Sequence, residues 1–238
     1  MSSSRFPGKP MTKILGKPMI QHVYERVSSC NSLDDTYVAT CDMEIYNFII
    51  SIGGKAVMTA NNHERASDRC AEALIKIEKE KNLIYDIVVM VQGDEPMTNS
   101  EMVQESLNPI INDDKVNVTN LKGKIDSIKE FEDRNCIKVI CDLNNNALAF
   151  SREPIPTRAN TNNLEMFKQV CVISFRRDFL LEYCELLPTP LEIIESIDMM
   201  RVLENGYKVK MVVTNHISYS IDVEKDKERV EKFMKNNL

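Results

Sequence analysis

The sequence lacks an excess of basic charge, a long apolar run and any closely spaced pair of cysteines. Its formal net charge is −6 at pH 7, whereas affinity for nucleic acid depends on surplus lysine and arginine. No apolar run approaches the length that spans a membrane, and the first residues show no secretory-signal pattern. These absences argue against a nucleic-acid-binding surface and against a membrane-bound protein.

The seven cysteines are scattered, odd in number and never arranged as CxxC. In a chain of this size, such spacing predicts free thiols, mostly packed as small apolar side chains, in a reducing cytoplasm. A structural zinc site is therefore not expected. No grouping of Ser, His and Asp, or of Cys and His, indicates covalent catalysis.

The chain has 238 residues, of which 43% are hydrophobic, so we expect a single domain over residues 1–238. Apolar strands alternate with helical patterns through the first half, which is typical of βαβ units on a parallel sheet. Residues 137–141 and 147–150 predict an antiparallel hairpin. The fold class predicted is α/β, Rossmann-like, with a mixed, mostly parallel sheet and an antiparallel flap. Further helices are expected at 18–27, 44–52, 69–80, 99–110, 178–186, 191–204 and 223–235, and strands at 35–40, 55–58, 87–91, 169–175, 208–213 and 219–221.

An apolar run at residues 87–91 is followed by Gly93, Asp94, Glu95 and Pro96. The run predicts a strand buried on both faces, which places the two carboxylates at its carboxyl end. Ligands bind at that end of open α/β sheets, and an acidic residue there often holds a divalent cation that binds phosphate. The alternative is an acidic loop after a core strand.

The first ten residues contain small hydroxylic residues together with Arg5, Gly8 and Lys9. Glycine lets the backbone approach a ligand closely, and the two cations could bind a polyphosphate. The alternative is a disordered, basic N-terminus.

Together these segments resemble the 3-deoxy-manno-octulosonate cytidylyltransferases, also called CMP-Kdo synthetases. The resemblance covers nearly the whole chain and rests on several motifs in the family's order. The motifs are Ser2-Ser3-Ser4-Arg5-Phe6-Pro7-Gly8-Lys9-Pro10, Gly16-Lys17-Pro18-Met19-Ile20-Gln21-His22-Val23, His63 through Arg69, Val91-Gln92-Gly93-Asp94-Glu95-Pro96, Ser151-Arg152-x-x-Ile155-Pro156, Pro188-Thr189-Pro190-Leu191-Glu192 and Ile221-Asp222.

The resemblance implies a reaction in which the anomeric hydroxyl of a keto-sugar acid attacks the α-phosphorus of CTP and pyrophosphate leaves. It implies that Arg5 and Lys9 contact the triphosphate and that Asp94 and Asp222 bind Mg²⁺. It also implies nucleotide contacts for Ser4, Lys17, His63, Arg65, Ser67 and Arg69, and sugar-acid contacts for Gln92, Arg152, Gln169, Glu195 and Asp198.

Two of these roles have alternatives. Asp222 could instead cap the terminal helix, because aspartate is a favoured N-cap residue. His63 could contact the nucleotide or only order its loop. Two rival functions also remain open, namely activation of a different nonulosonic acid and a catalytically inactive nucleotide-binding scaffold.

The chain departs from the family pattern in the residues expected to contact the sugar. Gln169 and Ile173 stand where the family has a His and a Tyr, and Asp198-Met199 replaces a Glu-Gln pair. Loss of hydrogen-bonding partners changes selectivity strongly. His63 through Arg69, which stands where the family has its base-recognition loop, differs too, because Arg65 replaces a serine. The reaction type is therefore better determined than the identity of the sugar acid.

A further departure lies at the beginning, because the family's first strand and its Ile-Pro-Ala-Arg motif have no counterpart before Met1. We expect that Met1 is an internal methionine of a longer reading frame, and that the 238-residue form has low stability or no activity. The family usually dimerises through its antiparallel excursion, here residues 131–175, so a homodimer is expected by resemblance.

Overall fold

The computed structural model describes Phe6 and residues 8–157, 165–221 and 223–237. The chain divides into two compact units, which are described separately. Unit 1 comprises Met1–Tyr85, Val91–Gln104 and Ile217–Leu238, and unit 2 comprises Asp86–Met90 and Glu105–His216. In the described part of the chain, no helix is long and apolar enough to cross a membrane.

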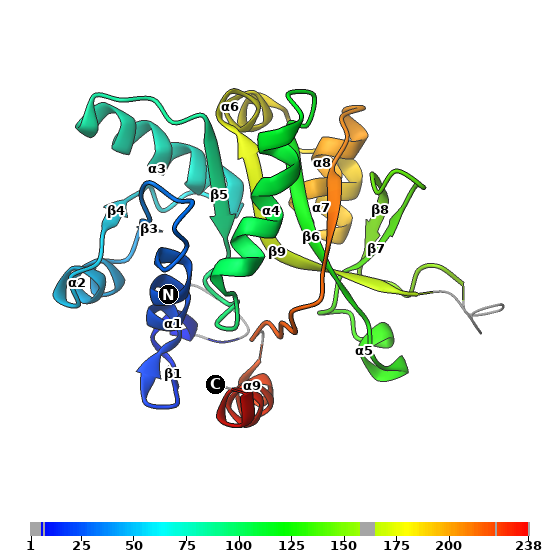
Figure 1. The fold of residues 1–238 in the computed structure, drawn as a ribbon, viewed down its shortest axis with the longest axis horizontal. Coiled ribbons are helices and arrows are strands. Elements are labelled where there is room, and N and C mark those ends of the chain that lie inside the picture. Colours follow the sequence, from blue (N-terminus) through cyan, green and yellow to red (C-terminus); the bar gives the residue numbers. More distant parts are fainter. Residues whose placement is uncertain (1–5, 7, 158–164, 222, 238) are drawn as a thin grey trace. The chain divides into compact units, whose positions relative to one another are not determined.

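Unit 1 contains a parallel strand pair, several helices and a small hairpin near its beginning (Figure 1). β3 pairs in parallel with β4, and β1 pairs antiparallel with β2. The elements are η1 (Lys9–Met11), β1 (Lys13–Ile14), β2 (Lys17–Pro18), α1 (Met19–Ser28), β3 (Val38–Thr40), α2 (Met43–Ser51), β4 (Ala56–Met58), α3 (Ala66–Lys81) and α9 (Glu224–Asn237).

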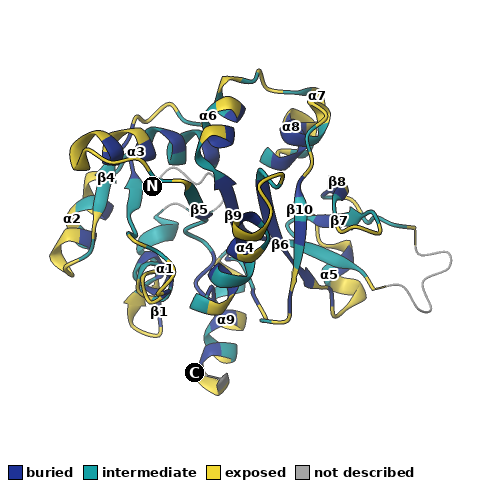
Figure 2. Cartoon of the chain, turned by 45° about the horizontal axis from the view of Figure 1, so that its top comes forward, coloured by how far each residue is buried: buried dark blue, intermediate teal, exposed yellow. Residues whose placement is uncertain are grey.

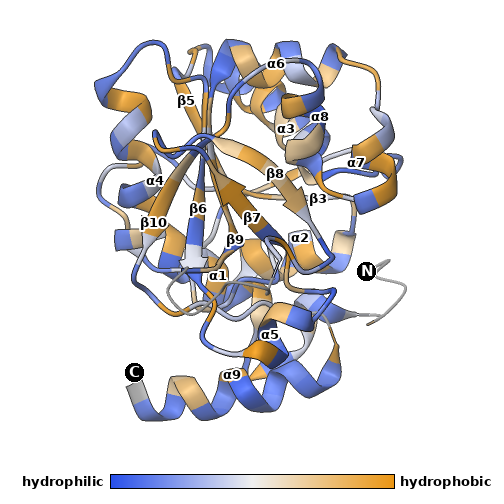
Figure 3. Cartoon of the chain, turned by 90° about the vertical axis from the view of Figure 1, so that its right-hand side faces the viewer, coloured by the Kyte–Doolittle hydropathy of each residue, from blue (hydrophilic) through white to orange (hydrophobic). Residues whose placement is uncertain are grey.

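Helix α9 packs against the β1–β2 hairpin and against the loop after β5 (Ile87–Val91). Most of α9 is hydrophilic (Figure 3), yet Val230 and Met234 are buried against Ile14, Met97 and Ile221. The Leu15 N–H also donates to the Glu231 carboxylate, at 3.1 Å. The terminal helix therefore contributes core contacts as well as a solvated face.

Unit 2 contains a mixed six-stranded sheet within the described residues. Its order is β10-β6-β9-β7-β8, and β5 pairs with β9. β6 lies parallel to β10 and antiparallel to β9, and its residues are buried except for Lys124 (Figure 2). The elements are β6 (Val118–Lys124), α5 (Ile128–Glu132), β7 (Lys138–Cys141), β8 (Ala147–Ser151), β9 (Phe167–Arg176), α6 (Arg177–Glu185), α7 (Pro190–Glu195), α8 (Asp198–Glu204) and β10 (Lys210–Thr214). Helix α4 (Ser100–Asn112) has residues in both units.

The structure bears out the α/β class, the mixed sheet and the hairpin of β7 with β8. Four expectations were wrong in detail. The sheet of unit 2 is not mostly parallel, because β6 pairs in parallel with β10 whereas the pairs β6–β9, β7–β8 and β7–β9 are antiparallel. The helix expected at 191–204 is two helices, because Ser196 adopts a left-handed conformation with φ of 54° between them. Residues 219–221 form no strand, and only Met90 is buried in β5, so that strand is not covered on both faces.

All seven cysteines are free, as predicted, so no disulfide contributes to either unit. Only Cys30 is fully buried, and the other six are partly accessible. None of the seven is exposed, and burial raises the pKa of the Cys70 thiol to about 12, in keeping with thiols that are at least partly packed.

The carboxylate of Asp35, in the segment before β3, connects several segments of unit 1 by hydrogen bonds. Asp35 accepts hydrogen bonds from Lys55, Lys81 and Tyr85, the last at 2.6 Å. Burial alone would raise the pKa of Asp35, but these donors outweigh it and hold that pKa well below its usual range. Burial, together with the hydrogen bond to Asp35, raises the pKa of Tyr85 to about 12.

Asp35→Asn should destabilise the protein at neutral pH but much less in acid. Because the folded-state pKa of Asp35 is depressed, its stabilisation is complete above the unfolded value of about 3.9 and is lost as the pH falls further. The difference in unfolding free energy between the wild type and Asp35→Asn, measured with denaturant, should be constant from pH 8 to about 5 and shrink below about 4. A difference that does not change with pH would contradict the role of the charge.

Candidate active site

The acidic turn after β5 is held by a lysine from the first residues described. Lys9 Nζ lies 2.7 Å from Asp94 Oδ2, and the two side chains are 11% and 20% exposed. Lys9 begins η1 directly after Gly8, whose φ of 72° is a conformation that glycine adopts without strain. A partly buried cation and carboxylate, both reachable from solvent, thus share one site at the end of a strand.

The chain segment before the terminal helix joins this turn. The Ile221 N–H donates to the Asp94 carbonyl at 3.0 Å. Ser218 donates to the neighbouring Glu95 carboxylate at 2.6 Å, and Glu95 is only 4% exposed. Glu95 is therefore used to anchor residues 217–221, which leaves Asp94 as the more accessible carboxylate of the pair.

Three predicted site residues, Ser4, Arg5 and Asp222, lie outside the described residues. Their roles stay predictions. Among the residues that are described, no group of three or more His, Cys, Asp or Glu side chains is placed to hold a metal ion.

The loop after β4 is held by helix α3. His63 bonds with the Glu72 carboxylate, which also accepts from the Ala60 N–H at 3.0 and 3.1 Å. Arg69 Nη1 donates to Thr59 Oγ1 at 2.5 Å and to the Ala60 carbonyl at 3.1 Å. The guanidinium of Arg69, predicted to contact nucleotide, is thus bonded to the loop itself.

Two other predicted nucleotide contacts lie where this loop meets α3. Arg65 is the N-cap residue of the helix and makes no side-chain capping bond. Ser67, in the first turn, is fully buried. The structure therefore brings His63, Arg65, Ser67 and Arg69 together at one end of α3.

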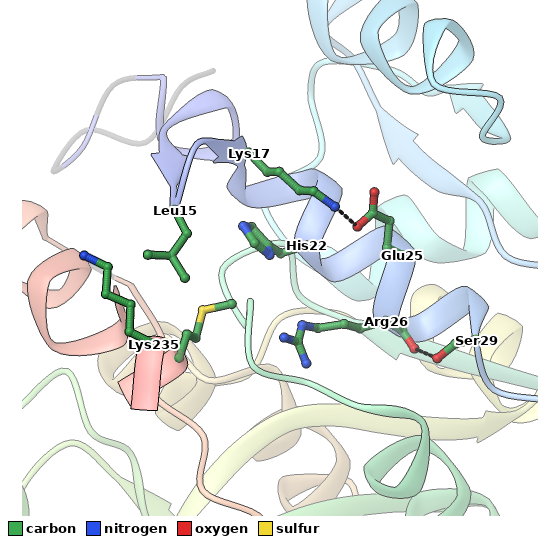
Figure 4. A pocket seen from close by; sticks show the side chains of 8 residues that line it. Leu15, Lys17, His22, Glu25, Arg26, Ser29 and Lys235 are labelled. Atoms are coloured by element: carbon green, nitrogen blue, oxygen red, sulfur yellow. Dashed lines mark hydrogen bonds and ion pairs between the residues drawn. The ribbon is translucent and has the colours of Figure 1, made fainter. Parts of the chain in front are cut away.

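Lys17 lies apart from these two groups. Its ammonium bonds with Glu25 at 2.8 Å, and the two side chains are 51% and 41% exposed (Figure 4). It lines a cavity of about 470 Å³ between α1 and the end of α9, where none of the other predicted site residues takes part in the lining. Its nucleotide contact stays a prediction.

The predicted sugar-acid residues other than Gln92 belong to unit 2, and two of them pair. The Glu195 carboxylate accepts from the Ser151 hydroxyl and from the Arg152 N–H, both at 2.8 Å. The Arg152 guanidinium donates to the Glu195 carbonyl at 2.7 Å and to the Arg134 carbonyl at 3.1 Å. The two side chains hold the end of β8 to the end of α7.

Gln169 and Asp198 lie elsewhere in unit 2. Gln169 donates to the side-chain oxygen of Asn120 at 2.6 Å, and Asn120 donates on to the Val170 carbonyl at 2.7 Å. The Asp198 carbonyl accepts from the Tyr183 hydroxyl at 3.1 Å. Gln92, in unit 1, is partly buried, and its carbonyl accepts from the Glu95 N–H at 3.2 Å.

The two apolar departures from the family pattern are core residues. Ile173 is 1% exposed and Met199 is 0% exposed. In this chain, apolar side chains packed in the core occupy these two positions. Hydrogen bonds that select one sugar acid over another must therefore come from other side chains.

Sequence reasoning missed Glu72 and Ser218, which hold the loops that carry the predicted site residues. Glu72 lies on α3 three residues after Arg69, a spacing that places both on one helix face. That spacing shows that the two side chains share a face, but the sequence does not indicate their partners, which include His63 and the backbone of Ala60. Hydrogen bonds from Lys76, His63 and the Ala60 N–H lower the pKa of Glu72 to about 2 despite some burial.

Comparison with known proteins identifies the family. The sequence pattern of the family described as cytidylyltransferase matches residues 1–211. The 3-deoxy-manno-octulosonate cytidylyltransferase of Fusobacterium nucleatum is 39% identical over 236 residues, which covers 99% of this chain and 94% of that protein.

Solved structures agree with the sequence comparison. A CMP:2-keto-3-deoxy-manno-octonic acid synthetase complexed with CTP has a TM-score of 0.89 and 34% identity, covering 100% of this chain and 95% of that one. The 4-diphosphocytidyl-2C-methyl-D-erythritol synthase of Anaerococcus prevotii has a TM-score of 0.61 and 13% identity over 95% of this chain and 93% of that one, which shows a shared fold alone. The chain therefore belongs to the cytidylyltransferase family, among the 3-deoxy-manno-octulosonate cytidylyltransferases.

Proposed function

We propose that this protein transfers CMP from CTP to the anomeric hydroxyl of 3-deoxy-manno-octulosonate, with release of pyrophosphate. The hydroxyl oxygen forms a bond to the α-phosphorus, the bond to the β-phosphate oxygen breaks, and the hydroxyl proton is lost. The observation that carries the proposal is the Lys9–Asp94 pair at the end of β5, in a chain of which 99% aligns with a relative of this family. The product would supply an activated sugar acid for surface-polysaccharide synthesis.

Such a transfer requires in-line positioning and neutralisation of phosphate charge more than covalent chemistry from the protein. Lys9 and Arg5 would bind the triphosphate, and residues of the loop after β4 would bind the base. Gln92 and Arg152 would bind the sugar acid. Lys9 is held by Asp94 before substrate arrives, which places its positive charge at the strand end.

Mg²⁺ is the cofactor we assign, and Asp94 and Asp222 would hold it. Carboxylate oxygens suit this ion, which commonly binds through one or two carboxylates together with substrate phosphates and water. The donor set therefore fits without a cluster of three protein ligands. When bound, the ion neutralises phosphate charge and polarises the α-phosphate. Support for Asp222 comes from its covalent neighbour Ile221, whose N–H bonds to the Asp94 carbonyl.

We further propose a cytoplasmic homodimer that pairs through residues 131–175. The seven free thiols are in keeping with a reducing compartment. The β7–β8 hairpin exposes two large apolar side chains, Leu148 at 61% and Leu143 at 103%. Sedimentation velocity measures this state, and a single monomer peak at micromolar concentration would contradict the dimer.

Pyrophosphate release from CTP, measured with a panel of keto-sugar acids, tests the function. We expect Mg²⁺-dependent release that is fastest with 3-deoxy-manno-octulosonate. Faster release with a sialic-type acid would reassign the substrate. Binding of CTP without release on any acid would favour the inactive nucleotide-binding scaffold.

A further inference from the structure

Helix α3 presents three charged side chains to the segment that leaves β4. Arg69, Glu72 and Lys76 are spaced by three and four residues, so they lie along one face of the helix. Lys76 donates to the Met58 carbonyl at 2.8 Å, and Arg69 to the Ala60 carbonyl at 3.1 Å. The backbone from the end of β4 to Ala60 is thus fixed by side chains of one helix.

Glu72 holds the loop at two points. Its carboxylate accepts from the Ala60 N–H and bonds with the His63 imidazole, and Lys76 balances its charge at 2.6 Å. Arg69 donates a hydrogen bond to the Ala60 carbonyl, so both the N–H and the carbonyl of Ala60 are bonded to side chains of α3. Residues 60–62 and 64 are exposed. Exposed loops of this kind are mobile unless side-chain bonds order them.

We propose that Glu72 is a positioning residue for recognition of the nucleotide base: it fixes His63 and residues 60–65 before the nucleotide binds. This inference rests on the proposed function of the loop after β4. A preordered loop binds without an ordering cost and presents its polar groups in one arrangement, which selects one base over another. The pKa of Glu72 is lowered to about 2, so its carboxylate is ionised near neutral pH and can accept both contacts there.

Glu72→Gln tests the proposal, since it keeps the shape and removes the charge. The KM for CTP should rise about tenfold or more, because an amide has one acceptor oxygen and no charge and so cannot keep both charged contacts, while kcat changes little. The preference for CTP over UTP should fall. Glu80→Gln is the matched control, on an exposed position of the same helix, and should behave as the wild type.

A double-mutant cycle separates positioning from general stability. His63→Gln should raise the KM for CTP in the wild type but add little in Glu72→Gln, because the two side chains act as one unit. Fully additive effects, or a fall in kcat at unchanged KM, would overturn the proposal. Equal loss of CTP and UTP turnover with a lower unfolding temperature would also overturn it, since that is the outcome of a purely structural role.

Hydrogen exchange of the Ala60 amide tests this inference separately from the proposed function. The Ala60 amide should exchange faster in Glu72→Gln than in the wild type and Glu80→Gln, whether or not the protein turns over CTP. Unchanged exchange would refute the positioning role. A wild type that shows the protected amide but no pyrophosphate release would refute the proposed function instead.

Discussion

Asp94→Asn is expected to lower kcat by about 10³-fold, because electrostatic stabilisation of the phosphoryl transition state is a large share of catalysis in such transfers. The change removes one negative charge and keeps the shape of the side chain. Asp94 is 20% exposed and pairs with Lys9, so the free energy of unfolding should fall by only about 1 kcal/mol. Steady-state rates of pyrophosphate release and denaturant unfolding measure the two quantities.

The matched control for this variant is Asp178→Asn. The side chain of Asp178 is 91% exposed and bonds with the neighbouring Arg177 on the surface of unit 2. Its rate and its stability should equal those of the wild type. An active Asp94→Asn enzyme would remove this carboxylate from the mechanism, whereas an inactive but unfolded variant would show that the residue is structural.

Glu192→Ala is expected to lower the free energy of unfolding by about 3–5 kcal/mol, because it leaves a buried guanidinium without its partner. Glu192 and Arg201 are 0% and 4% exposed and form two hydrogen bonds of 2.7 Å. Arg201 also stacks over the Tyr183 ring, at 4.7 Å. The pair joins α7 to α8, where a single helix was expected from the sequence. Urea or guanidinium unfolding measures the effect.

Replacement of both partners separates the charge penalty from lost packing. With methionine at 192 and 201 together, no buried charge remains, so the double variant should recover at least half of the stability that Glu192→Ala loses. If the free energy of unfolding lost in the double variant equals the sum of the losses in the two single variants, this explanation is contradicted.

The sequence predicted elements whose signal is local. The apolar run of β5 and the turn that follows it were placed correctly, as was the β7–β8 hairpin. β6 was missed because its sequence, Val-Thr-Asn-Leu-Lys-Gly-Lys, reads as polar. Its interior polar residues are satisfied by partners from other elements: Lys122 bonds with Asn145 at 2.9 Å, and Asn120 bonds with β9. Such partners are known only once the sheet has formed.

In the candidate site, too, residues with a local sequence pattern were predicted, and residues whose contacts depend on the folded structure were not. Asp94 and Lys9 were named from the sequence, and the structure places them in contact. Glu72, which holds the loop after β4, and Ser218, which bonds with Glu95, were not named, because their hydrogen-bond partners lie in other segments at no fixed spacing in the sequence. Ser196 likewise ends α7 through a left-handed conformation that serine rarely adopts, so the break could not be expected.

The central proposal is that Asp94 and Asp222 together hold Mg²⁺ for CTP. The most direct test is calorimetric titration of CTP with and without Mg²⁺, on the wild type, Asp94→Asn, Asp222→Asn and the double variant. The proposal predicts that Mg²⁺ strengthens CTP binding in the wild type, that each single substitution removes most of this gain, and that the double variant loses little more. A single variant that keeps the full gain would contradict it.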